Sequence, residues 1–250
     1  MSAPATQSGS TEATGHVPPA APQFDMTQMS DAEMARMMQM DDNAKFAMFK
    51  LDEFERGQRN DAYSTQWNAE GWYGGDFDKL WLRSEGDVEH GTTAARVEAF
   101  WDHAFASYWD WQIGAREDFG SGPGRGWAAF GVQGLAPYWF EVEATAYVGD
   151  QGRTAARFRA EYELLFTQRL ILQPELEVNL YSKSDPARAM ESGLSDAEFG
   201  LRLRYEIRRE IAPYLGVVWK YRRAEGGDFF PQPDRTTMEC QFVVGLRLWL

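Results

Sequence analysis

The sequence predicts an all-β fold, an antiparallel transmembrane β-barrel of about twelve strands. Large apolar side chains alternate with small or charged ones along most of the chain, as in the stretch FGLRLRYEI at 199–207. This period of two indicates strands with one apolar and one polar face. Short and long connections follow one another in turn, which is typical of outer-membrane barrels. No run of about 18 apolar residues occurs, so no transmembrane helix is expected.

Twelve segments carry the alternation, and most reach the roughly 9–11 residues that a tilted strand needs to cross a bilayer. They are residues 45–56, 62–74, 77–89, 93–105, 108–119, 126–136, 139–149, 154–166, 169–183, 196–208, 212–223 and 238–250. The tight connections are 75–76, 106–107, 137–138, 167–168 and 209–211. The polar or glycine-rich ones, several of them long, are 57–61, 90–92, 120–125, 150–152, 184–195 and 224–237. An even strand number returns both ends of such a barrel to the periplasm, with the short turns there.

The two faces of these segments differ in charge. In 154–166, Phe158 and Leu164 share one face, while Arg157, Arg159 and Glu161 share the other. A soluble sheet protein shows the same alternation, but its polar face favours Lys, Thr and Ser. Here Glu and Arg recur together, as in a narrow lumen where opposite charges neutralise one another.

Two sets of residues follow from the barrel interpretation. The charged side chains expected in the lumen are Glu98, Asp102, Arg116, Glu141, Glu143, Arg157, Arg159, Glu161, Glu163, Glu175, Glu177, Arg202, Arg204, Glu206 and Arg247. The aromatic residues expected to form girdles at the membrane interfaces are Trp72, Tyr73, Tyr108, Trp109, Tyr138, Trp139, Tyr214 and Trp249. A salt-bridged plug is the simpler reading of the lumen charges, and an ion path is the alternative.

The chain divides into residues 1–43 and a barrel at 44–250. Residues 2–23 are rich in Ser, Thr, Ala and Pro without apolar periodicity, so we expect disorder there. A short methionine-rich helix is expected at 31–40, because Ser30 is a suitable N-cap. The N-terminus lacks the basic and hydrophobic regions of a signal peptide. The protein is therefore either cytosolic or represented without its export signal.

The amino-acid composition limits the classes of partner that the protein can bind. Aspartate and glutamate outnumber lysine and arginine by 38 to 25. The resulting net charge of −13 argues against nucleic acid as a partner and is compatible with the binding of cations. Cys240 is the only cysteine, so the chain has no disulfide and no cysteine-based metal cluster. Cys240 alternates in step with Phe242 and Val244, so we expect it to lie on the apolar face of its strand as an unreactive residue.

Three long stretches resemble the copper-resistance protein B family of Gram-negative outer membranes. They are GWYGGDFDKLWLRSEG (71–86), the stretch from WAAFGVQGLAPYWF to ELEVNLY (127–181), and SGLSDAEFGLRLRYEIRREIAPYLGV (192–217). The resemblance covers roughly residues 41–250. It implies an outer-membrane barrel in copper resistance and metal homeostasis, with its N-terminal segment in the periplasm. The implied partners are copper ions, outer-membrane lipid and periplasmic copper-carrier proteins.

The best candidate copper site is a methionine cluster in the N-terminal segment. Its members are Met26, Met29, Met34, Met37, Met38 and Met40. Neutral, soft thioether sulfur selects Cu(I) over harder cations, and this spacing suits one or two such sites. The alternative is that a methionine-lined helix plugs or caps the barrel, since methionine packs flexibly. Family members typically add histidines here, but this segment has only His16, which weakens a case for Cu(II).

Other candidate residues lie in the barrel. His103 shares a face with Val97 and Trp101 near the expected periplasmic rim and is a candidate metal ligand. Asp87 and His90 in an expected outer loop allow a rival reading, an outer-membrane barrel hydrolase acting at the extracellular face. A soluble lipocalin-like binding barrel is a third reading. No GxSxG, HExxH, P-loop or CxxC motif occurs, so we do not expect an enzyme.

Overall fold

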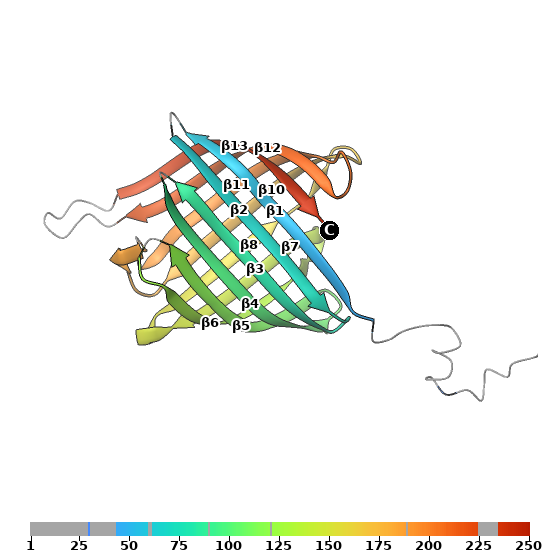
Figure 1. Ribbon diagram of the computed structural model, residues 1–250, viewed down its shortest axis with the longest axis horizontal. Coiled ribbons are helices and arrows are strands. Elements are labelled where there is room, and N and C mark those ends of the chain that lie inside the picture. The colour runs from blue at the N-terminus through green and yellow to red at the C-terminus, as the bar shows by residue number, and fades with distance from the viewer. Residues whose placement is uncertain are drawn as a thin grey trace, which may run out of the picture. The chain divides into compact units, whose positions relative to one another are not determined.

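In the computed structural model, antiparallel pairing runs around a closed sheet (Figure 1). The structure describes residues 30, 44–59, 62–89, 91–120, 122–188, 190–224 and 235–250. The barrel occupies the unit Lys45–Leu250. The predicted helix at 31–40 and the predicted disorder at 2–23 lie outside the described residues.

The strands follow one another around the wall almost in chain order. They are β1 (Phe46–Arg59), β2 (Ala62–Gly74), β3 (Asp78–Glu89), β4 (Thr92–Ala106), β5 (Trp109–Gly120), β6 (Arg125–Ala136), β7 (Phe140–Gly149), β8 (Thr154–Glu161), β9 (Leu164–Leu165), β10 (Leu170–Tyr181), β11 (Gly193–Tyr205), β12 (Ile211–Ala224) and β13 (Arg235–Trp249). β8 and β9 both pair with β10 and share one place in the wall. Pairing of β13 with β1 and of β10 with β11 completes the ring, so the predicted twelve-stranded barrel is confirmed.

The break between β8 and β9 differs from the continuous segment predicted at 154–166. It falls at Tyr162 and Glu163, opposite Pro174 of β10. Proline has no amide hydrogen to give to the ladder, so regular pairing stops there. Only the amide of Tyr162 still donates to the Pro174 carbonyl, at 3.1 Å.

The two ends of the barrel differ in the length of their connections. At one end, which we call the turn end, short turns join β2 to β3 and β4 to β5, and the 3₁₀ turn η2 (Pro137–Trp139) joins β6 to β7. β1 starts and β13 finishes at this end. At the other, the loop end, η3 (Asp150–Gly152) joins β7 to β8, and a longer connection containing η4 (Pro186–Arg188) joins β10 to β11. The predicted alternation holds only in part, because the long connection 182–192 lies at the loop end, whereas the β1–β2 and β3–β4 connections at that end have only two residues each.

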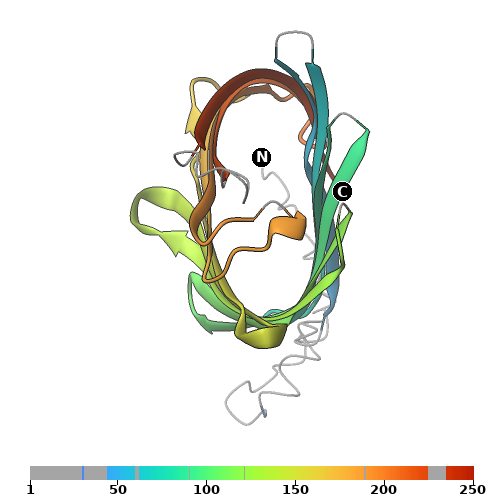
Figure 2. The same ribbon diagram turned by 90° about the vertical axis from the view of Figure 1, so that its left-hand side faces the viewer.

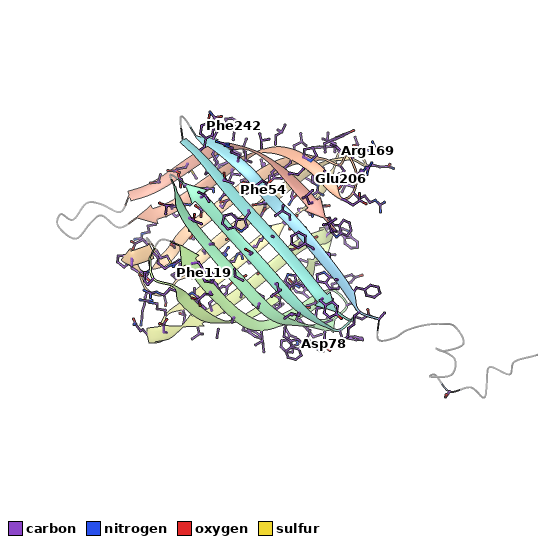
Figure 3. All side chains as sticks on the ribbon, in the orientation of Figure 1. Phe54, Asp78, Phe119, Arg169, Glu206 and Phe242 are labelled. Carbon is purple, nitrogen blue, oxygen red and sulfur yellow. The ribbon has the colours of Figure 1, made fainter. Side chains whose placement is uncertain are left out.

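The faces of the wall are inverted relative to a soluble protein. Large apolar side chains such as Phe130, Leu215 and Phe242 point outward and are 55%, 61% and 71% exposed. Charged side chains such as Glu98 and Arg157 are buried on the inner face. Figure 3 shows the labelled Phe54, Phe119 and Phe242 on the outside of the wall. Among the described residues no helix has the length and apolar character needed to span a membrane.

Candidate functional site

The lumen holds two cavities, one at each end, and both carry more acidic than basic side chains. The loop-end cavity has a volume of about 570 Å³, and nine carboxylates and six cationic side chains line it. The turn-end cavity measures about 300 Å³, with six carboxylates and three cationic side chains. On β3, Glu85 lines the first cavity and Arg83, two residues nearer the turn end, lines the second. Such a lining attracts cations and disfavours anions.

Ion pairs cross the lumen between these cavities. Arg157 on β8 is 2% exposed, and its Nη2 lies 2.7 Å from Glu85 Oε1 and 2.8 Å from Glu177 Oε2. β8 and β3 are five places apart around the wall, so the Arg157–Glu85 pair spans the barrel. Arg96 on β4 pairs with the same two carboxylates. We call Arg157, Arg96, Glu85 and Glu177 the central network. Figure 2 shows the oval outline of the wall around the lumen.

A second cluster gathers around Arg202 on β11. Its guanidinium lies 3.1 Å from Glu55, 2.8 Å from Glu53 and 2.9 Å from Glu175. Tyr214 donates its hydroxyl to Glu55 Oε2 at 3.0 Å. Tyr214 was predicted to belong to an aromatic girdle because it lies near the end of its segment. The structure corrects this, because Tyr214 is only 5% exposed and faces the lumen.

The turn-end cavity has its own ion pairs. Arg83 donates to Glu143 Oε1 at 2.5 Å, and Lys50 Nζ lies 2.6 Å from Asp52. The sequence prediction did not include Lys50, Asp52 or Glu55 among the lumen charges. In β1 a register shift between Leu51 and Glu53 interrupts the period of two, so no single parity places both Asp52 and Glu55 in the lumen. Arg83, Glu85 and Arg96 were also missing from the prediction, although β3 and β4 pair with each other without a register shift.

At the loop end, residues 182–192 form what we call the inward loop, which Figure 2 shows in orange, projecting into the barrel opening. Asp185 Oδ2 lies 2.9 Å from Arg125 Nε and 3.4 Å from Arg153 Nη1. Arg188 donates to the carbonyl of Pro123 at 2.8 Å and to that of Phe119 at 3.2 Å. These contacts attach the loop to the β5–β6 and β7–β8 connections.

The pKa of Asp185 reflects this attachment. Partial burial on its own raises a carboxyl pKa, but the hydrogen bond from Arg125 and the charges of Arg125 and Arg153 outweigh it. The pKa of Asp185 therefore lies below its ordinary value. The carboxylate is ionised, and the loop is attached, throughout the neutral range.

The structure places His103 outside the lumen, on the outer face of β4 at the turn end. Its Nδ1 lies 2.9 Å from Asp78 Oδ1, which also accepts a hydrogen bond from the Trp101 indole at 3.0 Å. Trp111 packs edge-on against Trp101, with ring centroids 4.8 Å apart. Figure 3 labels Asp78 at this rim. The predicted parity with Trp101 is correct. Within the described ranges, no group of three or more His, Cys, Asp or Glu side chains is arranged to hold a metal ion.

The remaining predicted ligands lie outside the described residues: His16, Met26, Met29, Met34, Met37, Met38 and Met40. The same is true of His90, the rival catalytic residue, whereas its partner Asp87 lines the loop-end cavity. The inward loop was predicted only as a polar connection. Its charged residues gave no signal that separates an inward from an outward course.

Comparison with known proteins identifies the family. A profile of the family described as Copper resistance protein B precursor (CopB) matches residues 45–250. The chain belongs to the copper resistance protein B family. It is 49% identical over 212 residues to a Copper resistance protein B homolog of Pseudomonas syringae pv. tomato, covering 84% of this chain and 72% of the relative. It is 43% identical over 209 residues to Copper resistance protein B of Escherichia coli, covering 83% and 71%. The resemblance seen in the sequence is confirmed.

Solved structures support the barrel architecture of this copper resistance protein B member. The NanC porin superposes with a TM-score of 0.52 at 12% identity, covering 81% of this chain and 99% of the porin. The KdgM porin gives 0.50 at 13% identity, covering 80% and 98%. At such identities the likeness concerns the fold alone. Family and fold together place the protein in the cell outer membrane, with a role in copper resistance.

Proposed function

We propose that the protein binds Cu(I) through its N-terminal methionines and that its lumen holds or conducts the ion. The observation that carries this proposal is the acidic excess in both cavities of a copper resistance protein B member. Carboxylates concentrate cations without selecting among them, so recognition of copper requires softer donors. The six methionines at 26–40 supply such donors. In this proposal residues 1–43 are a methionine-rich periplasmic segment separate from the barrel, and the turn end faces the periplasm.

The central network is as compatible with a lumen that holds the copper ion as with one that conducts it. Arg157 and Arg96 each bind one carboxylate on a neighbouring strand and one across the lumen, so an ion that passes must displace these contacts. Conduction therefore takes place through a rearranged network rather than an open pore. Periplasmic copper-carrier proteins are the proposed partners at the turn end, and outer-membrane lipid surrounds the wall.

Competitive Cu(I) titration of the full-length protein against a chromogenic chelator tests whether the N-terminal methionines bind Cu(I). Changing Met26, Met29, Met34, Met37, Met38 and Met40 together to Leu removes the thioethers while keeping side-chain volume. We expect the tightest Cu(I) sites to disappear. The matched control is Met238→Leu on the outer wall, where the side chain is 75% exposed, and it should bind as wild type does. Unchanged Cu(I) affinity in the six-fold variant would refute methionine capture.

His103 is proposed as an accessory ligand. The Asp78 carboxylate holds Nδ1, which leaves Nε2 as the imidazole atom available to a metal. Cu(II) titration of His103→Gln and His16→Gln, with His90→Gln as the control, measures what each imidazole contributes. Copper flux into and out of liposomes, measured separately, gives the direction of movement. A wild-type protein that moves copper in neither direction would leave binding and holding as the function.

A further inference from the structure

The inward loop carries a methionine into the loop-end cavity. Asp185 and Met190 are joined by a pair of backbone hydrogen bonds, 2.8 Å from the Asp185 amide to the Met190 carbonyl and 3.1 Å in return. The loop is therefore closed at its base, and the Asp185 and Arg188 contacts fix its position. Met190 lines the cavity as a result.

The surroundings of Met190 leave it partly buried. It packs against a cluster of buried side chains that includes Trp127 and Tyr181. Of the three described methionines, Met48, Met190 and Met238, only Met190 lines either lumen cavity. Every other donor that lines the loop-end cavity is a hard oxygen or a nitrogen.

We infer that Met190 is a selectivity residue for soft monovalent cations in the loop-end cavity. The inference rests on the proposed function and adds a second soft donor, apart from the N-terminal methionines. Carboxylates attract K⁺ and Cu(I) alike, whereas thioether sulfur favours Cu(I) and Ag(I). A single thioether binds weakly, which suits passage, because an ion in transit must bind well enough to enter and weakly enough to leave.

Cation flux through the full-length protein in liposomes tests this, with Ag⁺ as a redox-stable soft probe and K⁺ as the hard reference. Met190→Leu keeps the volume that packs against the buried cluster but removes the sulfur. We expect Ag⁺ flux to fall about tenfold, equivalent to losing about 1.4 kcal/mol of differential interaction, while K⁺ flux stays unchanged. Met238→Leu is the matched control and should change neither flux.

Two results would overturn the inference. Wild-type Ag⁺ flux in Met190→Leu would show that the sulfur contributes nothing. An equal loss of Ag⁺ and K⁺ flux would show that Met190 only supports the loop by packing. Failure of the proposed function looks different, because the six-fold N-terminal methionine variant would then keep wild-type Cu(I) affinity, whatever Met190→Leu does to Ag⁺ flux.

Discussion

Arg157 Nη2 lies 2.7 Å from Glu85 Oε1, although the two residues stand on strands five places apart around the wall. Side chains rather than a folded-in backbone segment thus connect the two sides of the oval barrel between its cavities. Two buried charges lose much hydration energy, which their attraction repays only when further hydrogen bonds satisfy them. Arg157 meets this condition at one atom, Nη2, which donates to both Glu85 and Glu177.

Replacing Arg157 is therefore expected to weaken the barrel and open it. Arg157→Gln leaves Glu85 and Glu177 short of a cationic partner, and breaking a buried pair in this way costs roughly 3–5 kcal/mol. Urea unfolding in lipid vesicles measures the loss of stability. Planar-bilayer recording should show higher K⁺ conductance, because one of the central network's two ion pairs across the lumen is gone and only Arg96–Glu177 remains.

Arg169→Gln is the control for Arg157→Gln. Arg169 is an exposed side chain in the turn between β9 and β10, as its label in Figure 3 indicates. Its replacement should leave both unfolding and conductance as in wild type. If Arg157→Gln behaves like this control, the central network neither stabilises nor closes the lumen.

Tyr214 offers a test of the Arg202 cluster that changes one hydrogen bond. Tyr214→Phe removes the hydroxyl that donates to Glu55 and keeps the ring. We expect a loss of about 1–2 kcal/mol in the free energy of unfolding, since the acceptor is a buried carboxylate. Tyr205→Phe on the outer face, 48% exposed, is the matched control and should change little. Equal stabilities for the two variants would contradict a structural role for the Tyr214 hydroxyl.

The strands were predictable from sequence because each depends on a local period of two. The partner of each lumen charge was not, because partners such as Arg157 and Glu85 are 72 residues apart and meet only when the barrel closes. Local irregularities in the strands also break the alternation of inward and outward side chains on which the prediction depended. The register shift in β1 leaves no single parity that places both Asp52 and Glu55 in the lumen, and Pro174 divided a predicted strand. The methionine sites stay a prediction.

The inward loop should detach when Asp185 loses its charge. The pKa of Asp185 is lowered, so its contribution is complete above the ordinary carboxyl pKa of about 3.9 and is lost as the pH falls below that value. A spin label at Ala187→Cys, in a Cys240→Ser background, reports loop mobility. We expect an immobile label from pH 5 to 8 and a mobile one only below about pH 4.

Asp185→Asn in the same labelled background removes the charge at neutral pH. The label should then be mobile at pH 7, because Arg125 and Arg153 have lost the carboxylate that attaches the loop. Asp76→Asn at the turn end is the control and should leave the label immobile. Mobility that changes between pH 5 and 7 in the native sequence would point to a group other than Asp185.

Because the outer face of the wall is apolar, the cost of placing a charge on it should depend on depth in the bilayer. Phe130 lies midway along β6 and is 55% exposed, whereas Phe119 lies at the loop end of β5 and is 48% exposed. An arginine on the lipid face costs about 2–4 kcal/mol at the bilayer midplane but only about 0–1 kcal/mol near the interface. Phe130→Arg should therefore destabilise the folded barrel in lipid vesicles far more than Phe119→Arg does. In a water-soluble barrel both positions would face solvent, and the two variants would unfold alike; that result would overturn the assignment of this face to lipid.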